Sequence, residues 1–299
     1  MQGLNLDTPS PTKRLILGTA QFGLPYGISN QRGQIPEAEI ATILTEAAKA
    51  GIDTLDTAAA YGSSEQCLGK VLHNLPAPYR IISKYPPNQP DKSVRQAFQE
   101  SLERLGADKL YGYLLHSYAS YSDKPKVLDE LQEMKSSGQV EKVGISLYHP
   151  AEAEELLLRE APIDLVQFPY SIFDRRFEEL LPELKNRGIE THIRSVYLQG
   201  LYFMQPDQLP LYLKEAAPKL ERLQQLAKAY QLPIGAVCLG FALANPYISR
   251  VVIGVESLQT LQENISFSKM PLPEALHTEL LELKEENETI LLPYKWSAT

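Results

Sequence analysis

Four side chains with complementary acid–base chemistry lie at or near the ends of three short apolar runs. Asp56 and Tyr61 occur in LDTAAAYGSSE, Lys84 closes RIISK, and His116 closes YGYLLH. A buried lysine beside a phenol favours the phenolate, so we expect Lys84 to lower the pKa of Tyr61 from about 10 towards neutrality. Asp56 would keep that lysine charged and oriented, and His116 could donate a hydrogen bond to a carbonyl oxygen. Tyr61 could then give this oxygen a proton while a hydride reaches the carbon, which is general-acid catalysis of carbonyl reduction.

This chemistry needs a fold that brings the ends of several strands together. Eight β-branched runs alternate with helical patterns, most of them about 30 residues apart, which is typical of repeated β–α–β units. The predicted strands are Arg14–Gly18, Ile52–Asp56, Arg80–Lys84, Tyr111–His116, Glu141–Ser146, Asp164–Phe168, Glu190–Ser195 and Arg250–Gly254. Such units pair in parallel through right-handed crossovers, and eight of them can close a barrel. We therefore predict one α/β domain over residues 1–299, a single (β/α)8 TIM barrel whose catalytic groups lie at the carboxyl ends of the strands.

Helical periods fill the intervals between these strands. Capping-box spacing at Ser63 with Gln66, and at Ser93 with Gln96, predicts two helix starts. Further helices are predicted at Pro125–Ser136, Ala151–Arg159, Phe177–Arg187, Leu211–Tyr230, Ile234–Leu243 and Leu258–Ser266. An extra C-terminal helix is predicted at about Pro273–Asn287, beyond the barrel repeat.

Composition excludes several classes of protein. Lysine and arginine total 29 against 37 acidic residues, a net charge of −8, which argues against nucleic acid and against an anionic membrane surface as partners. The nearly apolar stretch from Ile234 to Ala244 is far too short to cross a bilayer and reads as a buried helix. Cys67 and Cys238 cannot form a disulfide framework, and residues 1–14 lack the apolar core of a signal peptide. We expect a soluble, cytoplasmic protein.

In these residues and the motifs around them, the chain resembles the aldo-keto reductases, barrel oxidoreductases that use a nicotinamide cofactor without a Rossmann fold. The catalytic tetrad of that family falls on Asp56, Tyr61, Lys84 and His116. The resemblance covers nearly the whole chain, through LGTAQFG, GIDTLDTAAAYG, VGIS, IDLVQFPYSIFDRR and VVIGVESLQTLQEN. It implies NADP(H) or NAD(H) as cofactor and a small-molecule carbonyl compound as substrate. The sequence has no G-x-G-x-x-G motif, no Walker loop and no H-E-x-x-H metal motif.

The resemblance also assigns the dinucleotide to the carboxyl ends of the later strands. The positions it implies are Ser146 and Gln167 for the nicotinamide carboxamide, Ser195, Gly200 and Leu201 near the pyrophosphate, and Glu263 and Asn264 for the adenine. Two positions, one next to Ser146 and one next to Ser195, depart from the family pattern. Leu147 replaces an asparagine, and Arg194 replaces the aromatic residue that usually stacks on the nicotinamide. A planar guanidinium can also stack on a ring, and its charge could attract an acidic group on a substrate; alternatively, Arg194 pairs with a nearby acid.

The third departure concerns the second phosphate of NADP. From Gly254 through Glu256 and Ser257 to Thr260 there is no basic residue. Glu256 would repel a 2′-phosphate, whereas its carboxylate could accept hydrogen bonds from the ribose hydroxyls of NAD. In the alternative reading Glu256 points to solvent, and Ser257, Gln259 and a lysine from elsewhere hold the phosphate. Both NAD(H) and NADP(H) therefore stay open.

Aromatic residues dominate the loops expected at the mouth of the barrel. Phe22, Tyr26, Tyr118 and Tyr148 are candidates for a substrate pocket, and aromatic walls suit aldehydes, ketones or aldoses. Two other functions compete with carbonyl reduction. Lys84 could form a Schiff base in a lyase, which requires a neutral amine. The chain could instead be a nicotinamide-binding regulatory or accessory subunit with little turnover. No pattern in the sequence indicates an oligomeric state.

Overall fold

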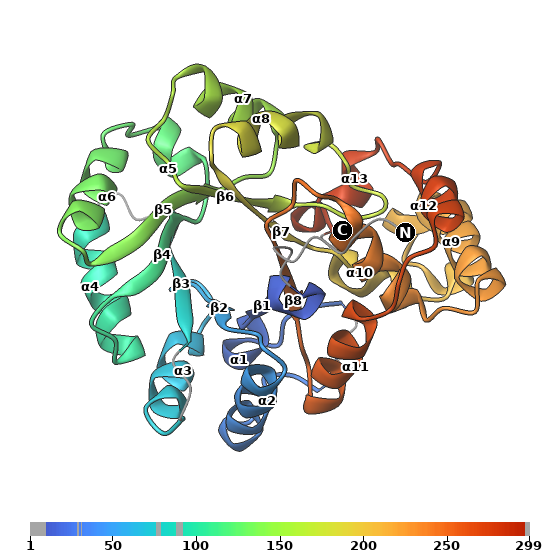
Figure 1. Cartoon of the computed structure of the whole chain (residues 1–299), viewed down its shortest axis with the longest axis horizontal. Helices are drawn as coiled ribbons and strands as arrows, with labels where there is room; N and C mark the ends of the chain where they lie inside the picture. Colours follow the sequence, from blue (N-terminus) through green and yellow to red (C-terminus); the bar gives the residue numbers. More distant parts are fainter. Residues whose placement is uncertain (1–9, 29, 31, 76–78, 88–91, 297–299) are drawn as a thin grey trace, which may run out of the picture.

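Eight parallel strands close into a barrel in the computed structural model, which describes residues 10–28, 30, 32–75, 79–87 and 92–296. Neighbouring strands pair in chain order, and β1 pairs with both β2 and β8 (Figure 1). The strands are β1 Leu15–Gly18, β2 Thr54–Asp56, β3 Arg80–Tyr85, β4 Leu110–Leu115, β5 Val140–Ser146, β6 Leu165–Pro169, β7 Glu190–Arg194 and β8 Arg250–Gly254. The predicted (β/α)8 barrel is confirmed. Residues 1–9, on which part of the signal-peptide argument depended, lie outside the described residues.

Helices surround the barrel and extend beyond it at the C-terminal end. The α-helices are α1 Ala20–Gly23, α2 Glu37–Lys49, α3 Ser64–Leu72, α4 Val94–Leu105, α5 Ala119–Ser122, α6 Val127–Ser136, α7 Pro150–Leu158, α8 Leu181–Asn186, α9 Ala217–Ala229, α10 Ile234–Ala244, α11 Leu258–Ser268, α12 Glu274–Leu281 and α13 Glu288–Leu291. The predicted cap at Ser93 is confirmed, because its hydroxyl accepts from the backbone N–H of Gln96 at 3.1 Å. The predicted helix start at Ser63 is also confirmed, since α3 begins at Ser64, but the side chain of Ser63 does not cap the helix and its hydroxyl instead accepts from Gln34.

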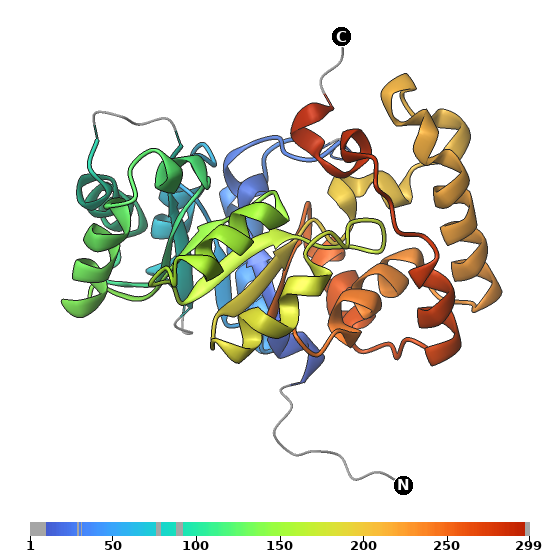
Figure 2. The same cartoon turned by 90° about the horizontal axis from the view of Figure 1, so that it is seen from above.

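The tail differs from the prediction. The expected helix Pro273–Asn287 ends at Leu281, and the chain then forms the short helix α13 and the 3-10 turn η6, Pro293–Lys295. In Figure 2 this red tail lies at the opposite end of the barrel from the dark blue start of the described chain. The tail therefore covers part of the mouth formed by the carboxyl ends of the strands.

The apolar segment of the sequence is an internal helix, as predicted. In α10 the residues from Gly235 to Ala242 are all buried. Within the described part of the chain, no single helix is long and apolar enough to cross a membrane; one pair bent by 95°, Leu211–Ala229 with Ile234–Ala244, satisfies the same length and composition criteria only when joined.

The alternation of side chains along the strands aims the candidate residues into the barrel. Ile82 of β3 and Leu114 of β4 belong to a small buried cluster that is separate from the main core. Successive strand residues point to opposite faces, so a residue two positions further along shares the same face. Lys84 and His116 stand in that relation to Ile82 and Leu114, and both therefore face the barrel axis at the carboxyl end.

The amino-terminal end of the barrel holds a polar network around Glu190, the first residue of β7. Lys142 Nζ lies 3.0 Å and His192 Nε2 lies 3.2 Å from its carboxylate, and the hydroxyl of Tyr111 donates to it at 3.1 Å. Burial alone would raise the pKa of Glu190, but the hydrogen bonds from His192 and Lys142 lower it to about 2. The network stabilises the charged form of Glu190 more in the folded chain than in the unfolded chain, so it contributes to stability at neutral pH.

We expect Glu190→Gln to lower the free energy of unfolding at pH 7 by about 2 kcal/mol. The pKa of Glu190 is lower in the folded chain than its ordinary value of 4.5, so its contribution is complete above pH 4.5 and is lost as the pH falls towards 2. Urea unfolding at pH 7 and pH 3.5 should therefore show a smaller difference from wild type at the lower pH. Glu141→Gln is the matched control, because Glu141 on β5 is half-exposed and pairs loosely with Lys109 at 3.7 Å. An equal loss at both pH values would contradict this account.

Candidate active site

A buried ion pair joins the second and third strands at the mouth of the barrel. Asp56 ends β2, Lys84 lies near the end of β3, and their side chains are 4% and 0% exposed. Lys84 Nζ lies 2.7 Å from Asp56 Oδ2 and donates to the carbonyl of Thr57 at 3.0 Å. Burial lowers the pKa of Lys84, and Asp56 opposes that shift. Each of the two charges is tolerated inside the barrel because the other is present.

Gln167 of β6 holds the other oxygen of the same carboxylate. Its Nε2 donates to Asp56 Oδ1 at 2.8 Å, and its side chain is buried. Ser146, its neighbour in register on β5, is also buried. The resemblance implied only a cofactor contact for Gln167. The sequence analysis missed the contact of Gln167 with Asp56, because β2 and β6 are far apart in the chain. The alternation of side chains along the two strands could have indicated it, since both residues point into the barrel.

Tyr61 and His116 complete the group. Their rings meet edge to face, with centroids 5.5 Å apart and an angle of 83°, and Lys84 Nζ lies 5.1 Å from the centroid of the Tyr61 ring. Tyr61 lies on a turn that packs closely against Gly23; a side chain at Gly23 would collide with the backbone of this turn. The structure therefore brings the four predicted catalytic side chains to one place.

The pKa shifts in this group favour neutral rings. Burial, followed by the charges of Lys84 and Arg194, lowers the pKa of His116 to about 3, and its Nδ1 is buried without a partner in the described part of the chain. Burial and the carboxylate of Asp56 raise the pKa of Tyr61 above its usual range. The expectation that Lys84 lowers this pKa is therefore wrong, because desolvation penalises the phenolate and Asp56 balances the lysine. A protonated phenol is the form that a general acid requires.

A cleft runs from this group to the start of α11. Asp56 and Tyr61 line one part of it, and Thr260 of α11 lines another. The predicted cofactor and substrate residues that also line it are Arg194, Ser195, Gly200, Gly254, Glu256, Glu263, Asn264 and Tyr26. One continuous cleft thus joins Asp56 and Tyr61 to most of the positions assigned to the dinucleotide.

The loop after β7 forms one wall of this cleft with an unusual backbone. Ser195, Leu198 and Gln199 have φ values of 64°, 45° and 51°, and Gly200 has φ 98°. Left-handed conformations of non-glycine residues are costly and cluster at ligand sites. At Gly200 the conformation itself requires glycine. The loop was predicted to lie near the pyrophosphate, but its strained path has no signal in the sequence apart from this glycine.

Several predicted site residues are engaged elsewhere. The side chains of Phe22 and Leu201 are fully buried in the main core, so the prediction that Phe22 lines the substrate pocket is wrong and Leu201 can offer only its backbone. The hydroxyl of Ser257 accepts from the backbone N–H of Thr260 at 3.1 Å and caps α11. The ring of Tyr118 packs against a neighbouring tyrosine, at a centroid distance of 5.6 Å.

The two predicted adenine contacts already have partners on α11. Glu263 accepts from Gln259 Nε2 at 2.9 Å. Asn264 donates to the carbonyl of Thr260 at 2.8 Å and accepts from the hydroxyl of Tyr197. Glu263 is exposed and Asn264 is buried, so the carboxylate is the more accessible of the two.

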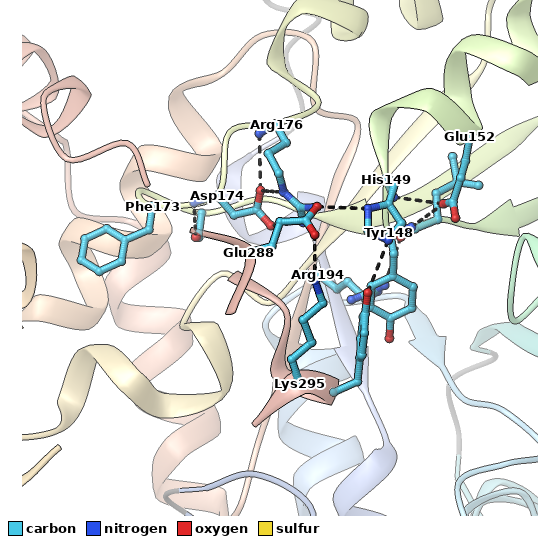
Figure 3. Close-up of polar contacts among 12 residues, drawn as sticks. Tyr148, His149, Glu152, Phe173, Asp174, Arg176, Arg194, Glu288 and Lys295 are labelled. Atoms are coloured by element: carbon cyan, nitrogen blue, oxygen red, sulfur yellow. Dashed lines mark hydrogen bonds and ion pairs between the residues drawn. The ribbon is translucent and has the colours of Figure 1, made fainter. Parts of the chain in front are cut away.

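Arg194, at the end of β7, is stacked on an aromatic ring rather than paired with an acid. Its Cζ lies 4.2 Å from the centroid of the Tyr148 ring, and its Nη2 donates to the carbonyl of Leu147 at 3.1 Å (Figure 3). In the described residues it makes no ion pair with a carboxylate. Its charge influences the pKa values of His116 and Tyr61. The alternative that Arg194 pairs with a nearby acid is not supported by this geometry.

Two contacts between loops that close the far side of the cleft were missed. Arg32, in the loop after β1, donates to the carbonyl of Glu256 at 2.7 Å and forms a bidentate pair with Glu39, at 3.0 and 2.8 Å. Gln199 Nε2 donates to the hydroxyl of Tyr26 at 3.0 Å, which links the loops after β1 and β7. Arg32 thus brings a cation to the strand end where the sequence has no basic residue. A local reading of the segment after β8 cannot reveal it, because Arg32 comes from the other end of the chain.

Comparisons with known proteins agree with this geometry. The sequence model of the Aldo/keto reductase family matches residues 14–285. A relative in Escherichia coli (strain K12), named NADH-specific methylglyoxal reductase, is 26% identical, with 96% of this chain and 100% of the relative covered. L-galactose dehydrogenase of Arabidopsis thaliana is 28% identical, with 86% and 84% covered. The solved structure of aldo-keto reductase AKR11C1 from Bacillus halodurans in its holo form has a TM-score of 0.74 at 24% identity, covering 90% of this chain and 91% of that one. From its barrel and the extent of the family match, the chain belongs to the aldo/keto reductase family of enzymes.

Proposed function

We propose that this protein is an NAD(P)H-dependent oxidoreductase that reduces an aldehyde or ketone to an alcohol, or runs the reverse reaction, with Tyr61 as the general acid. The observation that carries the proposal is the buried Lys84–Asp56 pair, 2.7 Å apart, under the ring of Tyr61 and next to His116. The cleft that begins there continues to α11. The enzymatic names of the relatives in the same family support a redox reaction of this class.

The cleft has the chemistry that a nicotinamide dinucleotide needs. Gly18, Gly200 and Gly254 line it and leave the backbone open to close approach. The N-terminus of α11, an 11-residue helix, favours a phosphate at the far part of the cleft. Arg194 would support the nicotinamide ring with the face of its guanidinium, in the position where relatives of the family use an aromatic residue. When bound, the reduced nicotinamide supplies the hydride.

The side chains of the tetrad account for the proton in this reaction. His116 is neutral, so it can donate one hydrogen bond to the substrate carbonyl oxygen and hold it beside Tyr61. As the carbonyl carbon gains the hydride, its oxygen takes the phenolic proton of Tyr61 and becomes the alcohol. The resulting phenolate is stabilised by Lys84, which Asp56 keeps charged and in place. Water then returns the proton to Tyr61.

The two competing functions have less support. A Schiff-base lyase needs Lys84 as a neutral nucleophile, and its 2.7 Å ion pair with Asp56 favours the charged amine. An accessory subunit with little turnover would bind a dinucleotide but would not oxidise it. The test is the oxidation of NADH and NADPH with a panel of aldehydes, ketones and aldoses, together with calorimetric binding of both dinucleotides. Binding of a dinucleotide without its oxidation by any of these carbonyl compounds would favour the accessory subunit and contradict the proposal.

For the choice of dinucleotide, we expect the kcat/KM measured with NADPH and that measured with NADH to differ by less than about tenfold. Glu256 disfavours a 2′-phosphate, and Arg32, the cation beside it, is neutralised by Glu39. The NADH-specific relative shows that the family includes enzymes without an NADPH preference. A thousandfold preference for NADPH would contradict this prediction.

A single substitution tests the role of the Arg32–Glu39 pair. Glu39→Gln should release Arg32 for a 2′-phosphate and raise the NADPH to NADH ratio about two- to fivefold, the worth of one exposed ion pair. Glu37→Gln is the matched control, because Glu37 lies in the same first turn of α2 and pairs with Lys70 instead. Equal ratios in the two variants would show that Arg32 does not face the 2′ position.

A further inference from the structure

The segment that follows α12 is an addition to the barrel. Its acidic residue Glu288 lies within ion-pair distance of three basic side chains. Glu288 begins α13, and the 3-10 turn Pro293–Lys295 follows directly. Glu288 Oε2 accepts from Lys295 Nζ at 2.8 Å, while its Oε1 lies 3.2 Å from Arg176 Nη1 and 3.3 Å from His149 Nδ1. These residues come from the loops after β5 and β6 and from the tail (Figure 3). One carboxylate therefore ties the tail to two loops of the barrel mouth.

The barrel residues at this junction have hydrogen-bond partners other than Glu288. Arg176 forms a bidentate pair with Asp174, with both hydrogen bonds at 2.9 Å, and the two side chains are only 10% and 1% exposed. In the loop after β5, the backbone N–H groups of Tyr148 and His149 donate to Glu152 of α7, at 2.7 and 3.0 Å. Loss of the charge on Glu288 would leave these partners satisfied, so the fold of the barrel does not depend on it.

Two aromatic rings connect the tail to the active site. Tyr294 lies in the tail between Glu288 and its partner Lys295. Its ring meets the ring of Tyr148 edge to face, with centroids 5.1 Å apart and an angle of 88°. The hydroxyl of Tyr294 also lies 3.3 Å from Nε2 of His149. The ring of Tyr148 in turn lies 4.2 Å from Arg194 Cζ. Tyr148 is thus supported by the tail and by the arginine that lines the cleft beside Tyr61.

From this chain of contacts we infer that Glu288 is a positioning residue of the active site. It holds the tail so that Tyr294 supports Tyr148, and Tyr148 fixes the guanidinium of Arg194 against the nicotinamide part of the cleft. The inference rests on the proposed function, because it assigns Arg194 to the dinucleotide. Glu288 itself is half-exposed and does not line the cleft within the described part of the chain, so it acts through other residues.

The expected effect is on binding more than on the chemical step. The hydrogen bond of Arg194 to Leu147 does not involve the tail, and no hydrogen bond, ion pair or ring contact joins the four tetrad residues to the tail in the described part of the chain. Glu288→Gln should therefore raise the dissociation constant for the reduced dinucleotide about three- to tenfold, the worth of one weakened cation–π contact. The kcat should stay within about twofold of wild type, because the tetrad is intact.

The single tryptophan of the chain gives an independent readout of the tail. Trp296 follows the 3-10 turn, is 8% exposed, and donates from Nε1 to the carbonyl of Thr289 at 2.8 Å. Its fluorescence thus reports the position of the segment that Glu288 holds, without any ligand. Glu288→Gln should shift the emission to longer wavelength and increase quenching by acrylamide.

Two sets of variants test the inference, with dissociation constants measured by calorimetry for NADH and NADPH. Glu286→Gln is the matched control, since Glu286 lies two residues earlier, is exposed and, among the described residues, forms an ion pair only with Lys284. Both its Trp296 fluorescence and its dissociation constants should equal those of wild type. Tyr294→Leu should weaken dinucleotide binding about as much as Glu288→Gln, whereas Tyr294→Phe keeps the ring contact and should restore binding to within about twofold of wild type.

Each outcome has a defined meaning. Exposure of Trp296 in Glu288→Gln together with weaker dinucleotide binding supports the inference. Exposure of Trp296 with unchanged binding would make the tail contact merely structural and overturn the inference. Unchanged Trp296 fluorescence would also overturn it, because Glu288 would not hold the tail. If the wild-type protein binds neither dinucleotide, the proposed function itself fails, and that result does not depend on any tail variant.

Discussion

Replacing Tyr61 by phenylalanine should lower the rate of carbonyl reduction at least about 10²-fold, because the phenylalanine has no proton to give to the developing alkoxide. The ring contacts with His116 and Lys84 are kept, so the shape of the site should not change. The loss should therefore appear in kcat, while the dissociation constant for NAD(P)H stays close to the wild-type value. Oxidation of NADH or NADPH with an aldehyde that wild type reduces is the measurement.

The matched control is Tyr247→Phe. Tyr247 is partly exposed and stacks with Lys185, whose Nζ lies 5.4 Å from the ring centroid. Since this residue precedes β8, at the opposite end of the barrel from the cleft, loss of its hydroxyl should not change the rate. Equal rates for wild type and Tyr61→Phe would remove the tetrad assignment, even if the protein binds a dinucleotide.

The pH dependence of the same reaction distinguishes two states of Tyr61. Burial raises the pKa of Tyr61 above its usual value, and the pKa of His116 is about 3, so neither group changes its protonation between pH 5.5 and 8.5. The wild-type kcat for reduction should therefore be nearly constant over that range. A fall in kcat with an apparent pKa near 7 would mean that Lys84 does lower the pKa of Tyr61, as expected from the sequence.

The residues that could be predicted from sequence are those whose position follows from a local repeat. Asp56 ends β2, and Lys84 and His116 lie within one residue of the ends of β3 and β4. Parallel strands in a closed barrel bring such ends to one mouth. Tyr61 follows the end of β2 by five residues, which predicts a place in the loop at the same mouth, and the close packing of Gly23 against its turn explains why the local geometry is possible.

The contacts that sequence reasoning missed join segments that are distant in the chain. Gln167 reaches Asp56 across the barrel, and Arg32 reaches the carbonyl of Glu256, which is 224 residues later in the chain. The pattern of apolar residues does not encode which polar partners such side chains find. Phe22 shows the opposite error, because an aromatic residue in a loop at the mouth can turn inwards and join the core. The direction of the Tyr61 shift was also missed, since the degree of burial of the phenol is a property of the complete packing.

Removing one member of the Asp56–Lys84 pair should destabilise the protein strongly. Lys84→Met leaves the carboxylate of Asp56 buried without its cation, and we expect a loss of about 3–5 kcal/mol in the free energy of unfolding. The pair is fully desolvated, with side chains 4% and 0% exposed, so solvent does not screen the remaining charge. Gln167 still donates to one oxygen, which limits the loss but does not neutralise it. Urea unfolding of the variant at pH 7 measures this cost.

The double variant Asp56→Asn with Lys84→Met separates this structural cost from catalysis. An asparagine oxygen can still accept from Gln167, and no buried charge remains, so the double variant should recover most of the stability lost in Lys84→Met. Its rate of carbonyl reduction should nevertheless stay low, because the cation that stabilises the phenolate of Tyr61 is missing in both variants. If the double variant regained activity along with stability, the pair would only support the fold. If instead it remained as unstable as Lys84→Met, the unpaired charge would not be the cause of the loss, and the account of Lys84 as a lysine held charged by Asp56 would have to be abandoned.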